Sequence, residues 1–118
     1  MRPRQPTVWQ RWPSGVLALE DGGRTVVLDT PAWLAWLEDP ATTGFAFPIH
    51  NHQCGWIEGF MTVRKEPRHR GAVYWTAYWR VGQRLRKVYL GPPTAVTGAH
   101  LTAISVEWLA QRCSTEGR

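Results

Sequence analysis

The amino-acid sequence predicts an α+β fold: an antiparallel sheet with an amino-terminal hairpin, one short helix, and a carboxy-terminal helix packed on one sheet face. Its apolar runs are short, and its 9 prolines and 11 glycines are scattered between them, which indicates many short elements joined by turns. The last apolar segment continues at helical spacing, as a longer helix requires. A length of 118 residues suits a single domain, 1–118, because two domains would each lack a sufficient core.

The first part of the chain, residues 1–50, is expected to form the hairpin and the short helix. Residues 16–20 and 24–29 flank Asp21-Gly22-Gly23, a sequence typical of a tight turn between paired strands. Residues 7–12, which end before a proline, are expected to add a strand to this hairpin.

A short helix is predicted over residues 31–38. Thr30 is placed as the N-cap, Pro31 occupies the first helical position, where its missing N–H costs nothing, and Pro40 stops the helix. The elements expected next are strands over 44–48 and 55–66, with a polar loop over 49–54 between them.

Residues 74–91 combine three tyrosines, two tryptophans and four cationic side chains, a mixture that a hydrophobic core excludes. Gly82 and Gln83 suit a two-residue hairpin loop of type II′, and directly opposed residues of a hairpin share a face. The core face then carries the pairs Val81–Arg84, Trp79–Arg86, Ala77–Val88 and Trp75–Leu90. The opposite face carries Tyr74, Thr76, Tyr78, Arg80, Leu85, Lys87 and Tyr89.

The strand before this hairpin follows the same alternation, with Met61 and Val63 facing inward and Thr62 and Arg64 facing outward. A register slip of one residue would exchange the two faces. The core is therefore expected to hold Trp75, Trp79, Val88, Leu90 and Trp108, while Tyr74, Tyr78 and Lys87 are expected to be largely exposed.

The carboxy-terminal helix is expected to begin after Thr97, a suitable N-cap. An apolar stripe at helical spacing is formed by Leu101, Ile104, Trp108 and Leu109. A second line of small apolar residues, formed by Ala99, Ala103, Val106 and Ala110, predicts contacts on two sides, from the sheet and from the amino-terminal hairpin. Residues 56–111 are thus predicted to form a three-stranded sheet plus a helix. We take them as the candidate nucleic-acid-binding unit.

The positive charge is concentrated in one block. The net charge is +5, yet residues 1–63 carry four arginines against six carboxylates, and residues 88–118 are balanced. Residues 64–87 carry eight cationic side chains against Glu66 alone, a net charge of +7. Such a block attracts polyanions, of which nucleic acid is the commonest inside cells.

The segments MTVRKE, YWTAYWRV and RKVYLG, followed by a threonine-capped helix, give the order of three strands and a helix. This order resembles the DNA-binding domains at the amino end of transposon and phage tyrosine recombinases and the plant ethylene-response-factor domain. Those domains lay an exposed sheet face in the DNA major groove. The resemblance covers roughly residues 56–111 and implies DNA contacts for Arg64, Arg80, Lys87 and Tyr89, and core positions for Val63, Val88 and Leu90.

The segments PAWLAWLED, FAF, VRKE and RKVYLG, in this order after an early hairpin, are similar to the amino-terminal region of large LuxR-type transcriptional regulators. The sequence departs from those regulators because neither a GxxxxGK[ST] loop nor a helix-turn-helix follows. The resemblance implies a sensor module or a DNA-contacting module, and it leaves the choice between these two roles open.

The leading functional hypothesis is a non-catalytic DNA-binding module of regulatory or mobile-element type, which uses a basic and aromatic sheet face. Duplex DNA ranks ahead of single strands, whose bases stack on aromatic rings, and ahead of a protein partner. The predicted nucleic-acid-binding residues are Arg64, Arg68, Arg70, Tyr74, Thr76, Tyr78, Arg80, Lys87 and Tyr89. The alternative is a protein-interaction or ligand-sensing domain with a platform of the three tyrosines. The oligomeric state is left open.

One segment resembles a metal site. His50, His52 and Cys54 alternate, so on a strand they would offer two imidazoles and a thiolate to a zinc ion from one side. The sequence places no fourth ligand nearby. We therefore expect a polar loop, no cofactor, and a protein that folds without metal.

No catalytic constellation is expected either. Ser14, Ser105 and Ser114 lie outside any GxSxG-type elbow and lack an adjacent base and orienting acid. The apolar runs are too short for a signal peptide or a membrane span, which predicts a cytoplasmic protein without a membrane partner. Cys54 and Cys113 then read as reduced thiols.

Overall fold

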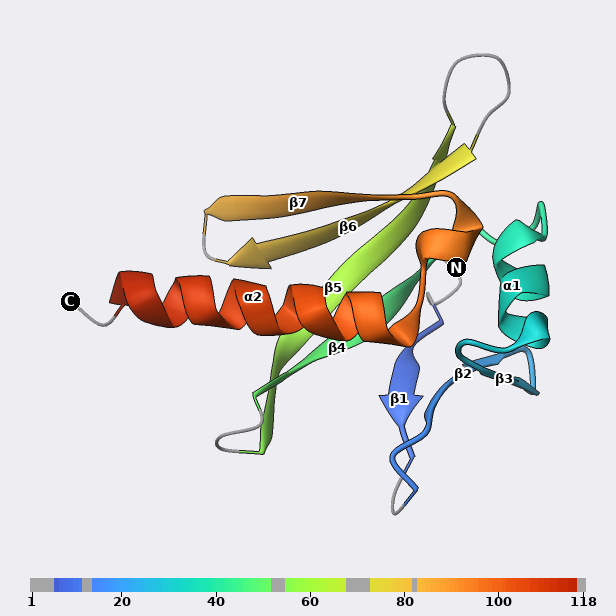
Figure 1. Cartoon of the computed structure of the whole chain (residues 1–118), viewed down its shortest axis with the longest axis horizontal. Helices are drawn as coiled ribbons and strands as arrows, with labels where there is room; N and C mark the ends of the chain where they lie inside the picture. Colours follow the sequence, from blue (N-terminus) through green and yellow to red (C-terminus); the bar gives the residue numbers. More distant parts are fainter. Residues whose placement is uncertain (1–5, 12–13, 52–54, 68–72, 82, 117–118) are drawn as a thin grey trace.

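The structure, a computed structural model, describes residues 6–11, 14–51, 55–67, 73–81 and 83–116. The described residues have the predicted α+β architecture, with two antiparallel sheets and two α-helices (Figure 1). The first sheet has the order β1-β2-β3, formed by Val8–Gln10, Leu17–Asp21 and Arg24–Val27. The second has the order β4-β5-β6-β7, formed by Gly44–Asn51, Trp56–Pro67, Val73–Val81 and Arg84–Gly91. The helices are α1 (Pro31–Glu38) and α2 (Gly98–Glu116), with a short 3₁₀ turn, η2 (Pro93–Ala95), before α2.

The amino-terminal hairpin and α1 form where the sequence predicts them. Gly22 and Gly23 connect β2 to β3 with φ values of 60° and 83°, a left-handed pair that glycine adopts without steric cost. The Thr30 hydroxyl accepts a hydrogen bond from the Trp33 backbone N–H at 3.2 Å, and so caps α1. The predicted third strand is also confirmed, because β1 pairs antiparallel with β2.

The tryptophans of helix α1 contact residues of both sheets. The Trp33 indole N–H donates to the Val96 carbonyl at 2.7 Å, and the Trp36 indole N–H donates to the Asp21 carboxylate at 2.8 Å. Both indole rings pack on Phe45 of β4, with ring centroids 5.2 Å and 5.9 Å away. One hydrophobic core therefore includes residues from both sheets and both helices.

The second sheet has four strands rather than the predicted three. Strand β4 runs to Asn51 and pairs with β5 along its length, so residues 49–51, predicted as part of a polar loop, belong to the strand. The other edge of β4 is met by the amino-terminal segment, where the Ala46 N–H donates to the Pro6 carbonyl at 2.8 Å. A parallel bridge between Thr7 and Ala46 extends this contact. Strand β4 therefore adds a fourth strand to the sheet predicted within residues 56–111.

The register of β6 with β7 confirms three of the four predicted pairs, Val81–Arg84, Trp79–Arg86 and Ala77–Val88. The fourth was wrong. A shift between Trp75 and Thr76 pairs Trp75 with Gly91 and Thr76 with Tyr89. A bulge places an extra residue opposite one partner residue, and Leu90 still turns its side chain into the core. Gly82, predicted to begin the type II′ turn, lies outside the described residues.

Helix α2 covers one face of the second sheet. The Thr97 hydroxyl accepts from the His100 N–H at 3.1 Å, as expected for an N-cap. The predicted stripe is buried, and Trp108 stacks on Trp79 with ring centroids 5.9 Å apart. The predicted second line does not make the contact expected of it, because Ala99, Ala103, Val106 and Ala110 are exposed. The amino-terminal part of α2 lies beside the first sheet: Gly98 is close to Leu17, its N–H donates to Asp29 at 2.8 Å, and Thr102 and Ser105 line a small hollow together with Gln10 and Leu17. The carboxy-terminal part of α2 runs away from that sheet (Figure 1).

The core contains the residues expected of it. Trp75, Trp79, Leu90 and Trp108 are buried, and Val88 is partly buried against the same cluster. We call the side of the second sheet that packs on the helices the inner face, and the opposite side the outer face.

Candidate nucleic-acid interface

The outer face is built by strand alternation. Because Met61, Val63, Trp75, Ala77 and Trp79 point to the core, their neighbours in sequence point to the other side. The outer face consists of Phe60, Thr62, Arg64, Glu66, Tyr74, Thr76, Tyr78, Arg80, Leu85, Lys87 and Tyr89. The predicted inward and outward sides of β5, β6 and β7 are therefore confirmed.

Three cationic side chains surround Tyr78 on this face. Lys87 is directly opposite Tyr78 on β7, and its ammonium lies 5.7 Å from the centroid of the phenol ring. Arg80 follows two residues later on β6. Arg64 lies diagonally across on β5, since Thr62 is opposite Tyr78 and Arg64 is opposite Thr76. Arg64, Arg80 and Lys87 are all exposed.

A carboxylate fixes the orientation of this central ring. The Tyr78 hydroxyl donates a hydrogen bond to Glu66 Oε2 at 2.5 Å. This hydrogen bond lowers the pKa of Glu66, and the positive charges of Lys87 and Arg64 lower it further. The same bond raises the pKa of Tyr78, because losing the phenol proton would place a second negative charge beside the carboxylate. Tyr78 is therefore held as a neutral ring among cations.

The exposure of the tyrosines differs from the sequence-based expectation. Tyr74 and Tyr78 are half-buried rather than largely exposed, whereas Tyr89 is 52% exposed. Tyr74 packs on Tyr89 with ring centroids 5.3 Å apart. Thr76, predicted as a contact residue, is only 3% exposed. The reason is that β6 is an interior strand, so side chains from β5 and β7 cover it from both sides.

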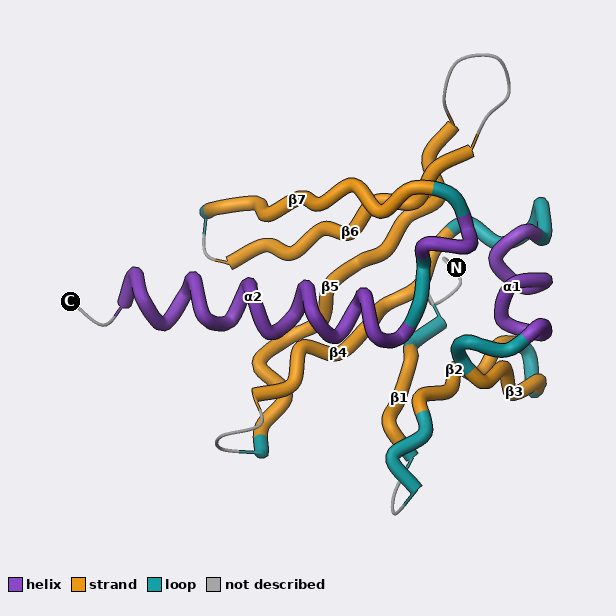
Figure 2. Tube along the Cα trace, in the orientation of Figure 1, coloured by secondary structure: helices purple, strands orange, loops and turns teal. Residues whose placement is uncertain are grey.

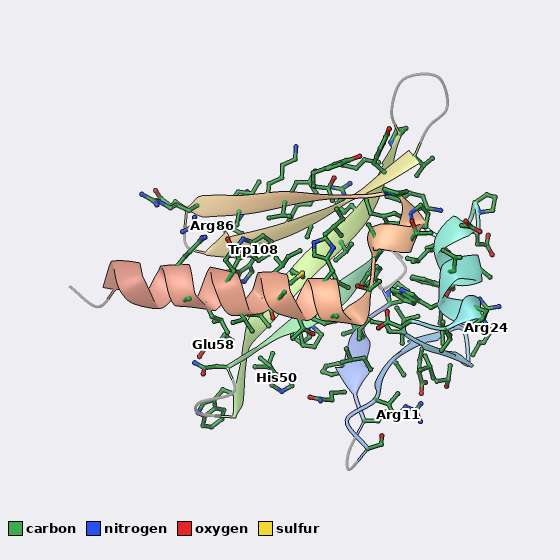
Figure 3. The ribbon with its side chains drawn as sticks, viewed as in Figure 1. Arg11, Arg24, His50, Glu58, Arg86 and Trp108 are labelled. Atoms are coloured by element: carbon green, nitrogen blue, oxygen red, sulfur yellow. The ribbon has the colours of Figure 1, made fainter. Side chains whose placement is uncertain are left out.

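The positive block divides between the two faces. The Lys65 ammonium points away from the outer face, donates to the Asp39 carbonyl at 2.8 Å and lies 5.6 Å from the centroid of the Trp75 ring. Burial is the largest influence on Lys65 and lowers its pKa. Arg84 and Arg86 lie on the inner side of the hairpin, where Arg86 is opposite Trp79. In the view of Figure 3, Arg86 and Trp108 both appear between the β6–β7 hairpin and α2. Arg68 and Arg70, also predicted to bind nucleic acid, lie outside the described residues.

Large apolar side chains are a part of the outer face that the sequence-based site omitted. Phe60 and Leu85 are 41% and 51% exposed. Trp9 of β1 contacts Phe60 edge to face, with ring centroids 5.6 Å apart, and so extends the apolar surface onto the first sheet. The alternation that placed Thr62 and Arg64 outward also places Phe60 outward, so this signal was present in the sequence.

A hollow of about 580 Å³ opens in the outer face. Strands β5 and β6 are paired from Pro67–Val73 as far as Thr62–Tyr78. Past that pair, within the described strands, β5 stays paired with β4 while β6 stays paired with β7 (Figure 2). The hollow lies where the two pairs separate, and it is lined by Glu58, Phe60, Arg64, Tyr78, Arg80 and Leu85.

The floor of the hollow is the Trp79 indole, which stacks on Trp108 of α2 beneath it. Gly59 permits this arrangement, since a Cβ atom at residue 59 would lie 3.2 Å from Trp79 Nε1. The Trp79 indole therefore lies between the hollow and Trp108 of α2.

The metal-like segment is only partly described. His50 belongs to β4, and His52 and Cys54 lie outside the described residues. In the part of the chain that the structure describes, no group of three His, Cys, Asp or Glu side chains is arranged to hold a metal ion. Likewise, no helix among the described residues combines the length and apolar character that a membrane span needs.

No protein-family model, curated protein or solved structure gives a significant match to this chain. The chemistry of the outer face is therefore the basis for a functional proposal.

Proposed function

We propose that the outer face is a non-catalytic binding surface for nucleic acid, with duplex DNA as its ligand. The observation that carries this proposal is the arrangement of Arg64, Arg80 and Lys87 around Tyr78. Three exposed cations on adjacent strands can each neutralise a phosphate, and an interleaved aromatic ring adds contact area beside the sugar and base edges.

The order of strands and helix supports duplex DNA as the first ligand to test, because it resembles domains that place a sheet face in the major groove. A regulatory or mobile-element role follows from the same resemblance. Packing beneath the sheet also supports binding, since Trp79 stacks on Trp108 on the inner face and so supports the strand that carries Tyr78 and Arg80.

The salt dependence of binding tests this proposal. Fluorescence anisotropy with a labelled generic duplex and the matching single strand, at several salt concentrations, should show tighter binding to the duplex. Each phosphate contact releases counterions, so three contacts imply a slope of log affinity against log salt of about −3. The proposal fails if the duplex does not bind at low salt, or if its affinity does not change with salt.

A second candidate is a protein partner, which the apolar side chains favour. Trp9, Phe60, Leu85 and Tyr89 are each roughly half exposed on the same side of the molecule. Aromatic residues with arginine are typical of protein–protein contacts. A folded protein that binds neither duplex nor single strand would favour this candidate.

A further inference from the structure

We infer that the hollow receives one unpaired nucleobase, which leaves the base stack of the bound nucleic acid. This inference rests on the proposed function, because it specifies which part of a nucleic acid the outer face recognises. The ligand class is a duplex with an extrahelical or easily extruded base, rather than a uniformly paired one.

The first argument is the origin and size of the hollow. A continuous sheet presents a ridge of side chains, whereas here the separation of β5 from β6 past Thr62–Tyr78 leaves an opening of about 580 Å³. This volume is within the range of sites that hold small ligands, roughly 300–1,000 Å³. A base inside the stack cannot enter such an opening, so only a base that has left the stack can fill it.

The second argument is the chemistry of the two sides. Phe60 stands on β5 and Leu85 on β7, on opposite sides of the separation, and both are about half exposed. An aromatic ring and an aliphatic side chain that face a common space suit a flat, apolar ring between them. Tyr78 adds a third ring, whose orientation the Glu66 hydrogen bond fixes.

The third argument is the carboxylate among the residues that line the hollow, that of Glu58. The Glu58 carboxylate is positioned by a hydrogen bond from the Asn51 side-chain amide at 3.1 Å. A carboxylate accepts through two oxygens with about four lone-pair directions, so it favours a base edge that presents an amino group. Cytosine, adenine and guanine present such a group, and thymine does not. Cytosine is therefore a suitable probe.

The fourth argument is charge. The exposed guanidiniums of Arg64 and Arg80 lie at the rim of the hollow, on β5 and β6. A nucleotide whose base is inserted keeps its phosphate outside, close to this rim. Guanidinium groups bind phosphate in a bidentate geometry, so the two arginines can hold the backbone on either side of the extruded nucleotide.

The test compares three labelled duplexes of one sequence: fully paired, with a single extrahelical cytosine, and with an abasic residue in place of that cytosine. The abasic duplex keeps the bend of a bulge but has no base to insert. We expect the cytosine bulge to bind roughly five- to hundred-fold more tightly than the other two, the range that stacking of one base implies.

Matched variants locate the effect. Phe60→Ala and, separately, Leu85→Ala should each bring the ratio of affinity for the cytosine bulge to affinity for the paired duplex close to one. Trp56→Ala is the control, because Trp56 is on the same strand as Phe60 and is 69% exposed but does not line the hollow. This variant should keep the full preference.

The outcomes separate this inference from the function on which it rests. Equal affinity for all three duplexes would overturn the base-insertion inference and leave the outer face as a duplex-binding surface. Loss of the preference in Trp56→Ala to the same extent as in Phe60→Ala would also overturn it. Failure of the folded protein to bind any of the three duplexes would overturn the proposed function itself, and the inference with it.

Discussion

Tyr78 shows how a single residue combines several roles on the outer face. Its ring is covered by Lys87 on one side, and its hydroxyl donates to Glu66 at 2.5 Å. Glu66 contributes a negative charge to a face proposed to bind phosphates, yet it also holds the ring in position. Glu66 therefore positions the Tyr78 ring, but its negative charge weakens the attraction of this face for phosphate.

The titration of Tyr78 tests this local arrangement. Replacing the carboxylate by Glu66→Gln should lower the pKa of Tyr78 toward its ordinary value, because the negative acceptor that favours the neutral phenol is gone. Phenolate absorbance against pH measures the titration, and subtracting the curve of Tyr78→Phe assigns it. An unchanged Tyr78 midpoint in Glu66→Gln would show that the hydrogen bond does not control the phenol.

The same pair predicts an acid-dependent contribution to stability. Folding lowers the pKa of Glu66, so its stabilising contribution is present above the pKa of the unfolded chain and is lost as pH falls through the folded value. Urea unfolding of the wild type and of Glu66→Gln should therefore differ at neutral pH and converge in acid. A difference that persists in acid would contradict the assignment.

At the scale of elements, the helix caps and the first turn were predicted more accurately than the ends and the register of the strands. The caps Thr30 and Thr97 and the Gly22-Gly23 turn act within a few residues, and each was predicted from the sequence. Strand β4 was predicted over 44–48, but Ile49–Asn51 also pair with β5, and the polar sequence of residues 49–54 did not indicate this extension. The bulge between Trp75 and Thr76 likewise was not predicted, because the alternation of side chains that gave the first three pairs carries no signal for a register shift.

For the candidate site, the sequence predicted which face each side chain occupies but not its burial or the hollow. Alternation gave the sides of Arg64, Tyr78, Arg80 and Lys87 correctly, because a strand has a fixed period of two. Alternation could not predict the burial of the Thr76 side chain, because burial depends on the side chains of the neighbouring strands. The hollow could not be predicted either, because it forms where two strand pairs separate.

Helix α2 offers a test of which of its faces stabilises the fold. Trp108→Ala removes a buried ring that stacks on Trp79, and should lower the free energy of unfolding by about 3–5 kcal/mol. Val106→Ala, on the exposed side of the same helix, should change it by less than about 0.5 kcal/mol. Chemical denaturation measures both. Similar losses from the two variants would contradict the observed packing of α2.

For the molecule as a whole, the arrangement of charge differs from its arrangement in the sequence. The block of residues 64–87 carries a net charge of +7, but strand alternation sends its cations to both faces of the sheet. Arg80 and Lys87 lie on the outer face, whereas Arg84 and Arg86 lie on the inner side of the same hairpin. If net charge alone determined binding, the two pairs would contribute equally to duplex affinity. The proposed site predicts a larger contribution from Arg80 and Lys87.

Two double variants of the hairpin test this difference most directly. Arg80→Ala with Lys87→Ala and Arg84→Ala with Arg86→Ala remove the same charge from opposite faces. With both variants shown to be folded by circular dichroism, duplex affinity is measured against salt. The outer-face variant should bind more weakly, with a salt slope smaller by about 2, and the inner-side variant should keep the wild-type slope. Equal losses in the two variants, or a larger loss in the inner-side variant, would contradict binding through the outer face.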